Sequence, residues 1–409
     1  MRQRKLRFGA LLALALMAGC LNDNGLEPSP GIPDQTNGRI TVINDETRLA
    51  ERCIDANEII AVDPTSLGKT GSAQAFSLRM LAEITPPVVN GSAVQATSVV
   101  LIGKYAYVSY NMAGSNYLGA IDVIQVKDGT KPLIKSEATF TDTDISSIAV
   151  DASNVYTATA TGNPAFESPS VVEALGVNNG GKLDLSGNRR RVLTSYAATS
   201  IAVSNGKIYA VTGNTGGLYT LSPDTLGVML FSPLSDARWV DTDDSRVVVV
   251  QGMPGRITVF DKASGYLLNT YLFSGASITE SKSTVRLIGG KALIAAGDGG
   301  VMLMNLSDGS IVGSLPHVIV SGLDPSRSVT NAVDGAGQNL FISNGEAGVY
   351  AAQASVPLEG QAGTNPITLT MLGQLRFQNL QSVNHVAFDG EILVIAAGLG
   401  GVKILSVTY

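Results

Sequence analysis

Seven segments of this chain repeat one pattern, and the repeat limits the possible folds more than any other feature of the sequence. Each segment has a polar residue, an apolar run, a tight polar or glycine-containing turn and a second apolar run, as in TSIAVSNGKIYAVTG from Thr199. When the segments are aligned on the turn, their leading positions are 50, 53, 39, 45, 47 and 53 residues apart. These leading positions are Thr97, Ser147, Ser200, Trp239, Thr284, Asn331 and Asn384.

The apolar runs of each repeat are expected to be β-strands, because they are short, rich in β-branched residues and bounded by turn residues. A period of about 40 to 50 residues with about four strands in each repeat is typical of β-propeller blades. The last repeat, residues 384–409, has room for three strands only, while an unassigned strand at 75–85 precedes the first repeat. We therefore predict an all-β, seven-bladed β-propeller over residues 75–409, closed by this N-terminal strand, which removes the free edges of an open sheet.

A second element, Gly-x-x-Gly, follows the second strand in five of the repeats. Because tight hairpin turns need a positive φ that glycine adopts at low cost, we expect these motifs to be hairpin turns. A phosphate-binding loop is the rival interpretation, but no predicted helix follows any of the motifs. The five motifs are Gly213–Gly216, Gly252–Gly255, Gly297–Gly300, Gly345–Gly348 and Gly398–Gly401.

The first twenty residues have the features of a secretory signal. A basic start is followed by the apolar run 11–17, which is too short to cross a bilayer, and then by Ala18, Gly19 and Cys20. The segment resembles a bacterial lipoprotein signal, in which small residues precede an acylated cysteine. The resemblance implies a signal peptide over 1–19, lipid chains such as palmitate on Cys20 and, with Leu21 next, the outer membrane. An ordinary signal peptide with a chance cysteine is the alternative.

Two further segments separate this leader from the repeats. Residues 20–38 are rich in Pro, Gly, Asn and Asp and have no apolar period, which predicts a flexible tether. Residues 39–74 form an N-terminal extension with a short strand-like run and a possibly helical piece, and they fit no repeat. Cys53 lies in this extension, and once Cys20 is acylated it has no cysteine left to pair with in the chain.

The first repeat carries a resemblance to a known family. Residues 99–140 contain VVLIGKYAYVSY, an Ile-Asp-Val strand and a Pro-containing turn, and they resemble the LVIVP repeat of bacterial surface propellers. Residues 202–227 are similar, more loosely, to WD40-like and YVTN-type propellers. The resemblance covers about residues 75–409 and implies the fold, whereas propellers of one fold host many unrelated activities.

The leading positions of the repeats are candidate binding residues, because symmetry places them in a ring at the start of the innermost strands, around the central channel. Arg238 and Trp239 would supply a charged and an aromatic anchor, and His385 follows the leading position of the last repeat. The alternative is that the hydroxyls and amides of the ring satisfy backbone groups at the strand starts. The candidate set is Thr97, Ser147, Ser200, Arg238, Trp239, Thr284, Asn331, Asn384 and His385.

Composition excludes several functional classes. With 28 Lys and Arg against 34 Asp and Glu, the chain has a formal net charge of −6 and no basic excess for binding nucleic acid. Two His and two Cys exclude most His- or Cys-rich metal sites and any multi-disulfide scaffold.

A solvated turn is the expected location of the acidic cluster Asp241, Asp243 and Asp244. We predict no catalytic residue, no metal and no cofactor.

These observations predict a lipid-anchored propeller of the cell envelope that acts as a non-catalytic binding or scaffold module for a protein or glycan partner. We predict that the segment 161–191 is the largest insertion of any repeat and expect it to contact such a partner. The alternative is a propeller enzyme, lactonase-like or active on glycans, with a site at the central channel. Two or more carboxylates converging near His385 would favour the enzyme.

Overall fold

A computed structural model describes residues 35–69, 76–360, 363, 365–377 and 381–409 of this chain. The predicted signal peptide, Cys20 and residues 20–34 of the predicted tether lie outside the described residues. No described helix is both long enough and apolar enough to span a membrane.

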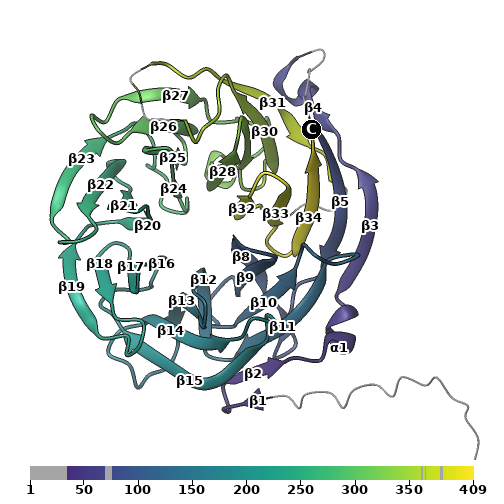
Figure 1. The fold of residues 1–409 in the computed structure, drawn as a ribbon, viewed down its shortest axis with the longest axis vertical. Helices are drawn as coiled ribbons and strands as arrows, with labels where there is room; N and C mark the ends of the chain where they lie inside the picture. The colour runs from purple at the N-terminus through teal and green to yellow at the C-terminus, as the bar shows by residue number, and fades with distance from the viewer. Residues whose placement is uncertain (1–34, 70–75, 361–362, 364, 378–380) are drawn as a thin grey trace, which may run out of the picture. The chain divides into compact units, whose positions relative to one another are not determined.

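Seven antiparallel sheets are arranged around a central axis, which confirms the predicted seven-bladed β-propeller (Figure 1). Blade 1 contains β8 (Gln95–Ile102), β9 (Tyr105–Asn111), β10 (Gly119–Gln125) and β11 (Leu133–Phe140). Blade 2 contains β12 (Thr143–Val150), β13 (Asn154–Thr161), β14 (Ser170–Val177) and β15 (Leu183–Val192). Blade 3 contains β16 (Ser200–Ser204), β17 (Lys207–Val211), β18 (Gly217–Leu221) and β19 (Val228–Pro233).

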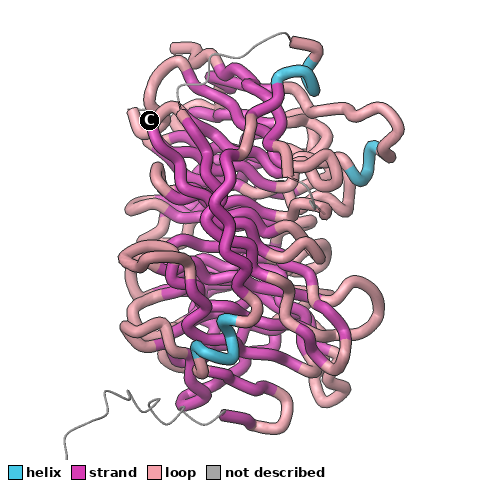
Figure 2. The backbone as a smooth tube through the Cα atoms, turned by 90° about the vertical axis from the view of Figure 1, so that its right-hand side faces the viewer, coloured by secondary structure: helices cyan, strands magenta, loops and turns pink. Residues whose placement is uncertain are grey.

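Blades 4 to 6 follow the same order, with the innermost strand first in sequence. Blade 4 contains β20 (Ala237–Thr242), β21 (Arg246–Gln251), β22 (Arg256–Asp261) and β23 (Leu267–Leu272). Blade 5 contains β24 (Val285–Ile288), β25 (Lys291–Ala295), β26 (Val301–Asn305) and β27 (Ile311–Leu315). Blade 6 contains β28 (Ala332–Ala336), β29 (Asn339–Ser343), β30 (Val349–Ala354) and β31 (Leu369–Leu375). Seen from the side, strands form the body of the ring and loops gather on its two faces (Figure 2).

Blade 7 closes the ring with strands from both ends of the chain. Its three inner strands are β32 (His385–Phe388), β33 (Ile392–Ala396) and β34 (Val402–Thr408), and β5 (Ser77–Ile84) pairs with β34 as the fourth. The register runs antiparallel from Val402 opposite Ile84 to Thr408 opposite Ser77. The predicted closure by an N-terminal strand is confirmed.

The apolar cores lie between neighbouring blades, because alternate residues of a strand face opposite sides of its sheet. On β9, Val108 packs with Val394 and Ile404 of blade 7, whereas Tyr107 packs with Ile148 of blade 2. Both faces of the inner strands are therefore covered, which is why β9 reads as a nearly continuous buried run. The described chain has seven such clusters, matching the seven junctions of a closed ring.

The N-terminal extension runs along the outer edges of three blades; we call its described part, residues 35–69, the clasp. In the clasp, β2 (Ile40–Ile43) pairs with β11 of blade 1 and also with β1 (Gln35–Thr36). Further along, β3 (Cys53–Ile59) pairs with β5 of blade 7, and β4 (Val62–Asp63) pairs with β31 of blade 6. The helix α1 (Glu46–Ala50) and the 3-10 turn η1 (Pro64–Leu67) connect these strands.

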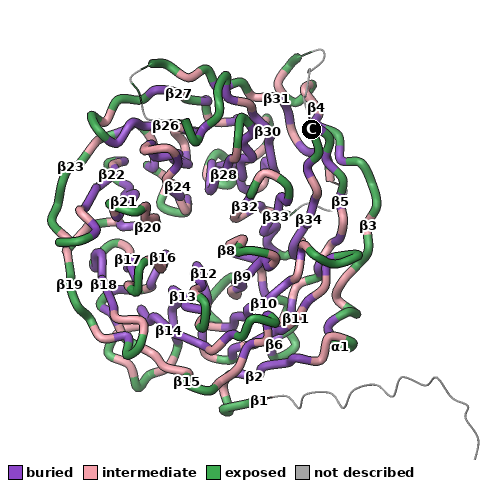
Figure 3. Tube along the Cα trace, in the orientation of Figure 1, coloured by how far each residue is buried: buried purple, intermediate pink, exposed green. Residues whose placement is uncertain are grey.

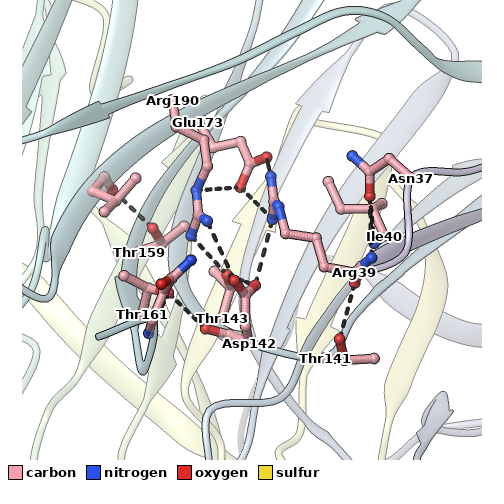
Figure 4. A network of polar contacts seen from close by, with 12 residues as sticks. Asn37, Arg39, Ile40, Thr141, Asp142, Thr143, Thr159, Thr161, Glu173 and Arg190 are labelled. Carbon is pink, nitrogen blue, oxygen red and sulfur yellow. Dashed lines mark hydrogen bonds and ion pairs between the residues drawn. The ribbon is translucent and has the colours of Figure 1, made fainter. Parts of the chain in front are cut away.

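Ion pairs fasten the clasp to the blades it crosses. Arg39 binds Glu173 and Asp142 of blade 2, and Arg190 binds the same two carboxylates (Figure 4). At the other end of the clasp, Asp63 binds Arg376, which follows β31. The carboxylate of Glu173 is fully buried, so these guanidinium groups supply the compensation that a buried charge requires.

Between these two points, Arg52 of the clasp reaches into blade 1. Its guanidinium forms a two-pronged contact with Asp122, at 2.9 and 2.7 Å, and also binds Glu137. Asp122 further accepts a hydrogen bond of 2.7 Å from the hydroxyl of Tyr110. Both carboxylates are buried, and the positive charge of Arg52 offsets the free-energy cost of removing their negative charges from water.

The Gly-x-x-Gly motifs form tight turns, and in four repeats the first glycine of the motif also bridges to the next blade. Gly213 bridges to Ala237, Gly297 to Thr330, Gly345 to Val383 and Gly398 to Ala96. Each of these four glycines has a positive φ, between 56° and 70°. The motif therefore joins blades in addition to turning the chain, and each motif leads directly into a strand in the described part of its blade.

Candidate functional site

Most side chains of the predicted channel ring bond the neighbouring blade. Thr97 donates to the carbonyl oxygen of Ile145 in blade 2 at 2.8 Å, and Ser200 accepts from the amide of Val240 in blade 4 at 3.2 Å. From blade 7, Asn384 donates to the carbonyl oxygen of Ala96 at 2.7 Å. These contacts correspond to the structural alternative, in which the ring satisfies backbone groups at the strand starts.

Three other members of the ring are also buried. Asn331 donates to the carbonyl oxygen of Val383 at 3.3 Å, again linking one blade to the next. The guanidinium of Arg238 binds Asp236 and the carbonyl oxygens of Ile278 and Ser281. The hydroxyl of Ser147 is buried and has no hydrogen-bond partner among the described residues.

Trp239 and His385 differ from the rest of the ring, because they meet across the channel. Trp239 lies on β20 of blade 4 and His385 on β32 of blade 7, strands that face each other across the central opening (Figure 1). Their rings are stacked, with centroids 5.1 Å apart and an angle of 25° between the planes. Burial, Lys282 and Arg286 together lower the pKa of His385 to about 3, so its imidazole is neutral at physiological pH.

Lys282 also crosses the channel, a role that the sequence did not reveal. It precedes β24 of blade 5, yet its ammonium donates to the carbonyl oxygens of Thr97 in blade 1 (2.6 Å) and Ser146 in blade 2 (3.2 Å). The ammonium lies 5.6 Å from the centroid of the Trp239 ring. No carboxylate pairs with it within the described part of the chain, and burial lowers its pKa to about 7.

A cavity of about 320 Å³ lies on the axis and is lined by residues of all seven blades. Trp239, Thr284 and His385 lie at one end of the lining, and residues near the opposite ends of the innermost strands, such as Ser204 and Asp389, complete it. Blades 1 to 3 contribute apolar wall, including Val100, Ile148 and Ile201. Blades 4 to 6 contribute the charged groups described next, so the cavity has one apolar side and one polar side.

Arg286 of β24 is the cation of the cavity. Its Nε and Nη1 bind the two carboxylate oxygens of Asp334, at 3.1 and 3.2 Å. Asp334 is buried and also accepts hydrogen bonds from the amides of Phe388 and Gly335. The Arg286 side chain keeps 46% of its surface accessible, so part of the guanidinium remains available to a molecule in the cavity.

Asp241 corrects one expectation. It lies within β20 and lines the cavity, whereas Asp243 and Asp244 lie in the turn that was expected for all three. Its carboxylate accepts from the amides of Leu287 (2.7 Å) and Thr242 (2.8 Å). Burial raises the pKa of Asp241 to about 6, against the lowering effect of these hydrogen bonds and of Arg286. The alternation of Trp239 and Asp241 along one strand was the available signal, since residues two apart share a face.

The predicted insertion at 161–191 is also different in the structure. Most of it forms β14 and β15, the third and fourth strands of blade 2, so it is part of the blade. Among the described residues, no group of three or more His, Cys, Asp or Glu side chains is placed to hold a metal ion.

A second candidate site lies on the outer edge of the ring, at the edge strands β19, β23 and β27, which we call the bare rim. None of the 17 residues of these three strands is charged, and each strand is the last of its sheet. The rim is largely exposed (Figure 3). Large apolar residues there are between 41% and 77% exposed: Val228, Met229, Leu230, Phe231, Tyr266, Leu267, Leu268, Leu272 and Ile311.

The three strands of the bare rim adjoin one another. A Cβ built on Gly265, before β23, would lie 2.2 Å from the Leu230 side chain of β19, and one built on Gly309, before β27, would lie 2.2 Å from the Tyr271 ring of β23. A groove of about 520 Å³ between blades 3 and 4 is lined by Leu230, Tyr266 and Leu267 among others. The rim is therefore continuous from blade 3 to blade 5.

The other four blades have edges of a different kind. The clasp covers the outer strands of blades 1, 6 and 7, and its own exposed strand β3 carries Asp55 and Glu58. Blade 2 ends in β15, which carries three consecutive arginines, Arg189 to Arg191. Charged or covered edges are the usual protection against unwanted strand pairing, and blades 3 to 5 lack it.

Comparison with known proteins supports the fold. No family profile matches the chain, and no curated protein matches its sequence. Among solved structures, U3-55K is similar over 79% of this chain and 98% of its own, with 14% identity and a TM-score of 0.54. The computationally designed Ika8 protein matches 86% of this chain and 96% of its own at 13% identity and a TM-score of 0.48. BamB from Moraxella catarrhalis matches 87% and 98% at 9% identity and a TM-score of 0.47. Likeness at such low identity concerns the fold alone.

Proposed function

We propose that this chain is a non-catalytic binding module of the cell envelope that holds a protein partner on its bare rim. The observation that carries the proposal is the contrast between the two halves of the ring. The clasp covers blades 1, 6 and 7, and blade 2 is charged, whereas the edges of blades 3 to 5 are apolar, uncharged and exposed.

The size of the rim supports a protein partner. At roughly 200 Å² for a fully exposed residue of this size, the nine large apolar residues of the rim present on the order of 900 Å². The largest apolar patch of an ordinary monomer is about 300 to 600 Å². One side of a standard protein–protein interface buries about 800 Å². The rim therefore offers what one partner of a stable complex needs.

The chemistry of the rim also defines the partner. The outer backbone groups of β19 and β23 are unpaired within the sheets, and an extended apolar segment can hydrogen-bond to such an edge while its side chains enter the groove between blades. A charged or nucleic-acid partner would find no counter-charge on these strands. The partner we propose is a protein that presents an apolar, uncharged segment.

The cavity bears on the non-catalytic part of the proposal. Asp241 and Asp334 do reach the cavity together with His385, which is the arrangement that an enzyme would require. However, Arg286 binds both oxygens of Asp334, and with its pKa lowered to about 3 His385 is a weak base. Neither of these two groups is set up as a strong general base at neutral pH, which leaves Asp241, with its pKa raised to about 6, as the carboxylate on which the enzyme alternative would depend.

The cell-envelope location rests on the leader sequence. We propose that the chain is cut before Cys20 and held to the outer membrane by lipid chains on that residue. Metabolic labelling with an alkyne analogue of palmitate tests this. The proposal expects label on the wild-type chain and none on Cys20→Ser, and a wild-type chain without label would contradict it.

Partner binding is tested with charge substitutions of matched exposure. Leu272 of the rim is 70% exposed and Ile59 of the clasp strand β3 is 71% exposed. In tagged chains crosslinked in intact cells, Leu272→Glu and Leu267→Glu are expected to lose a stoichiometric protein partner that wild type and Ile59→Glu retain. Equal recovery of that partner with all four chains, at equal thermal stability, would refute the proposal.

A further inference from the structure

We propose that the axial cavity is a second binding site, separate from the rim, for a neutral saccharide of one or two rings. The site is built by β20, β24 and β28 on its polar side and by β8, β12 and β16 on its apolar side. Its central residues are Trp239, Asp241 and Arg286.

The shape of the cavity sets the size of the ligand. At about 320 Å³ it lies at the small end of the range of ligand pockets, about 300 to 1,000 Å³. The Trp239–His385 stack forms one end of its lining, and the ammonium of Lys282 lies beyond the lining, bound to the carbonyl oxygens of Thr97 and Ser146. A small molecule fits such a cavity, whereas a polymer passing through the ring would meet these side chains.

The charges around the cavity favour a neutral ligand. A cation would meet the guanidinium of Arg286, which lies within the lining. An anion would meet the carboxylates of Asp241 and Asp334, both within the lining. Because the lining holds charged groups of both signs, a ligand that carries no charge avoids a like charge in the cavity.

The hydrogen-bonding groups favour a ligand rich in hydroxyls. Among the described residues, Asp241 accepts hydrogen bonds only from two backbone amides, and a carboxylate can accept about four, so it can accept more from a ligand. Arg286 uses Nε and Nη1 for Asp334, and its Nη2 has no hydrogen-bond partner among the described residues. A hydroxyl group both donates and accepts, so neighbouring hydroxyls on one sugar ring can satisfy both side chains.

The walls suit the apolar faces of a sugar. Trp239 and Asp241 lie two residues apart on β20 and therefore share a face, which places an indole beside the carboxylate. On the opposite side, Val100 lines the cavity together with Ile148 and Ile201, whose side chains are mostly buried between the blades. A sugar ring presents C–H groups to such walls and hydroxyls at its edge, so one ring contacts both sides of the cavity.

The intrinsic fluorescence of the protein gives a direct test, because Trp239 is the single tryptophan of the chain. Purified protein is titrated with glucose, galactose, N-acetylglucosamine, maltose, cellobiose and lactose, and with the charged analogues glucosamine and glucuronate. Saturable change in Trp239 emission is expected for at least one neutral sugar, with affinity about tenfold or more above that for its charged analogue. Free N-acetyltryptophanamide serves as the control for optical artefacts.

Variants then assign the site. Asp241→Asn and Arg286→Lys are expected to weaken binding about tenfold or more by calorimetry, because each removes a hydrogen bond to a charged group. Asp244→Asn, in the exposed turn that follows β20, is the matched control and keeps wild-type affinity. The proposal is overturned if no neutral sugar binds up to about 50 mM. Binding that is equal in Asp241→Asn and wild type, or tighter for a charged analogue, overturns it as well. None of these results depends on the partner of the rim.

Discussion

The rings of Trp239 and His385 stack with their centroids 5.1 Å apart, although they belong to blades 4 and 7. This contact ties facing sides of the ring together, a connection that blade-to-blade pairing cannot make. It also places the tryptophan where its emission reports on the centre of the molecule.

Loss of the stack should be visible in both fluorescence and stability. His385→Ala removes the ring that covers Trp239, so we expect a changed emission maximum and a loss of about 1 kcal/mol in the free energy of unfolding. His317→Ala is the control, since His317 bonds the carbonyl oxygen of Ser328 and takes no part in the Trp239–His385 stack. An emission spectrum that is identical in His385→Ala and wild type would show that the rings do not stack in solution.

Lys282 should make stability depend on pH. Burial lowers its pKa from 10.5 to about 7. The unfolded chain therefore holds a proton between about pH 7 and 10 that the folded chain lacks, so this lysine makes wild-type stability fall as the pH falls through that window. Lys282→Met removes the dependence. Measured by urea unfolding, the stability of Lys282→Met relative to wild type is expected to be higher at about pH 7 than at about pH 10. Parallel profiles for the two proteins would contradict the buried location of the ammonium.

The contact of the clasp with blade 1 should contribute strongly to stability. Arg52→Met leaves the buried carboxylates of Asp122 and Glu137 without their cation, and we expect a loss of about 3 kcal/mol or more. Lys131→Met breaks an exposed pair with Asp55, where both side chains are more than half accessible. An exposed pair of this kind contributes less than about 1 kcal/mol. Equal losses in the two variants, measured by denaturant unfolding, would show that the clasp does not depend on Arg52.

The glycine turns should differ in their tolerance of a methyl group. Gly206 and Gly398 both have a positive φ, but a Cβ on Gly206 meets no atom within 4 Å, whereas one on Gly398 lies 2.8 Å from the carbonyl oxygen of Ser382. Gly206→Ala is expected to cost about 1 kcal/mol from backbone strain alone, and Gly398→Ala about 3 kcal/mol. Similar melting temperatures for the two variants would argue against the close contact at the closure of the ring.

The repeat in the sequence was sufficient to predict the fold, including the strand that closes blade 7. The polar residues at the strand starts were also recognised as a set. Their partners were not, because the pattern shows which positions are equivalent without showing which way each side chain points. Thr97 and Asn384 turn towards the next blade, while Trp239 and His385 turn towards the axis.

The cavity and the rim were less accessible to sequence analysis, for two different physical reasons. Lys282 and Arg286 reach the channel from a loop and from a strand of one blade. The partners of Lys282 lie far away in sequence, in blades 1 and 2, and the partner of Arg286 lies in the next blade, blade 6. The uncharged runs VMLFSP and LLNTYL are visible in the sequence. Their exposure follows only from the pairing of the clasp with blades 1, 6 and 7, which leaves these strands uncovered.

The central claim is that the bare rim holds a protein partner, and site-specific photocrosslinking in intact cells tests it most directly. A photoreactive benzoylphenylalanine replaces Leu272 of the rim or, as the control, Ile59 of the clasp, which is exposed to the same degree. The account predicts one crosslinked protein of defined mass from position 272 and none from position 59. It also predicts that Leu267→Glu removes this crosslink. No crosslink from position 272, or the same crosslinked protein from both positions, would contradict the account.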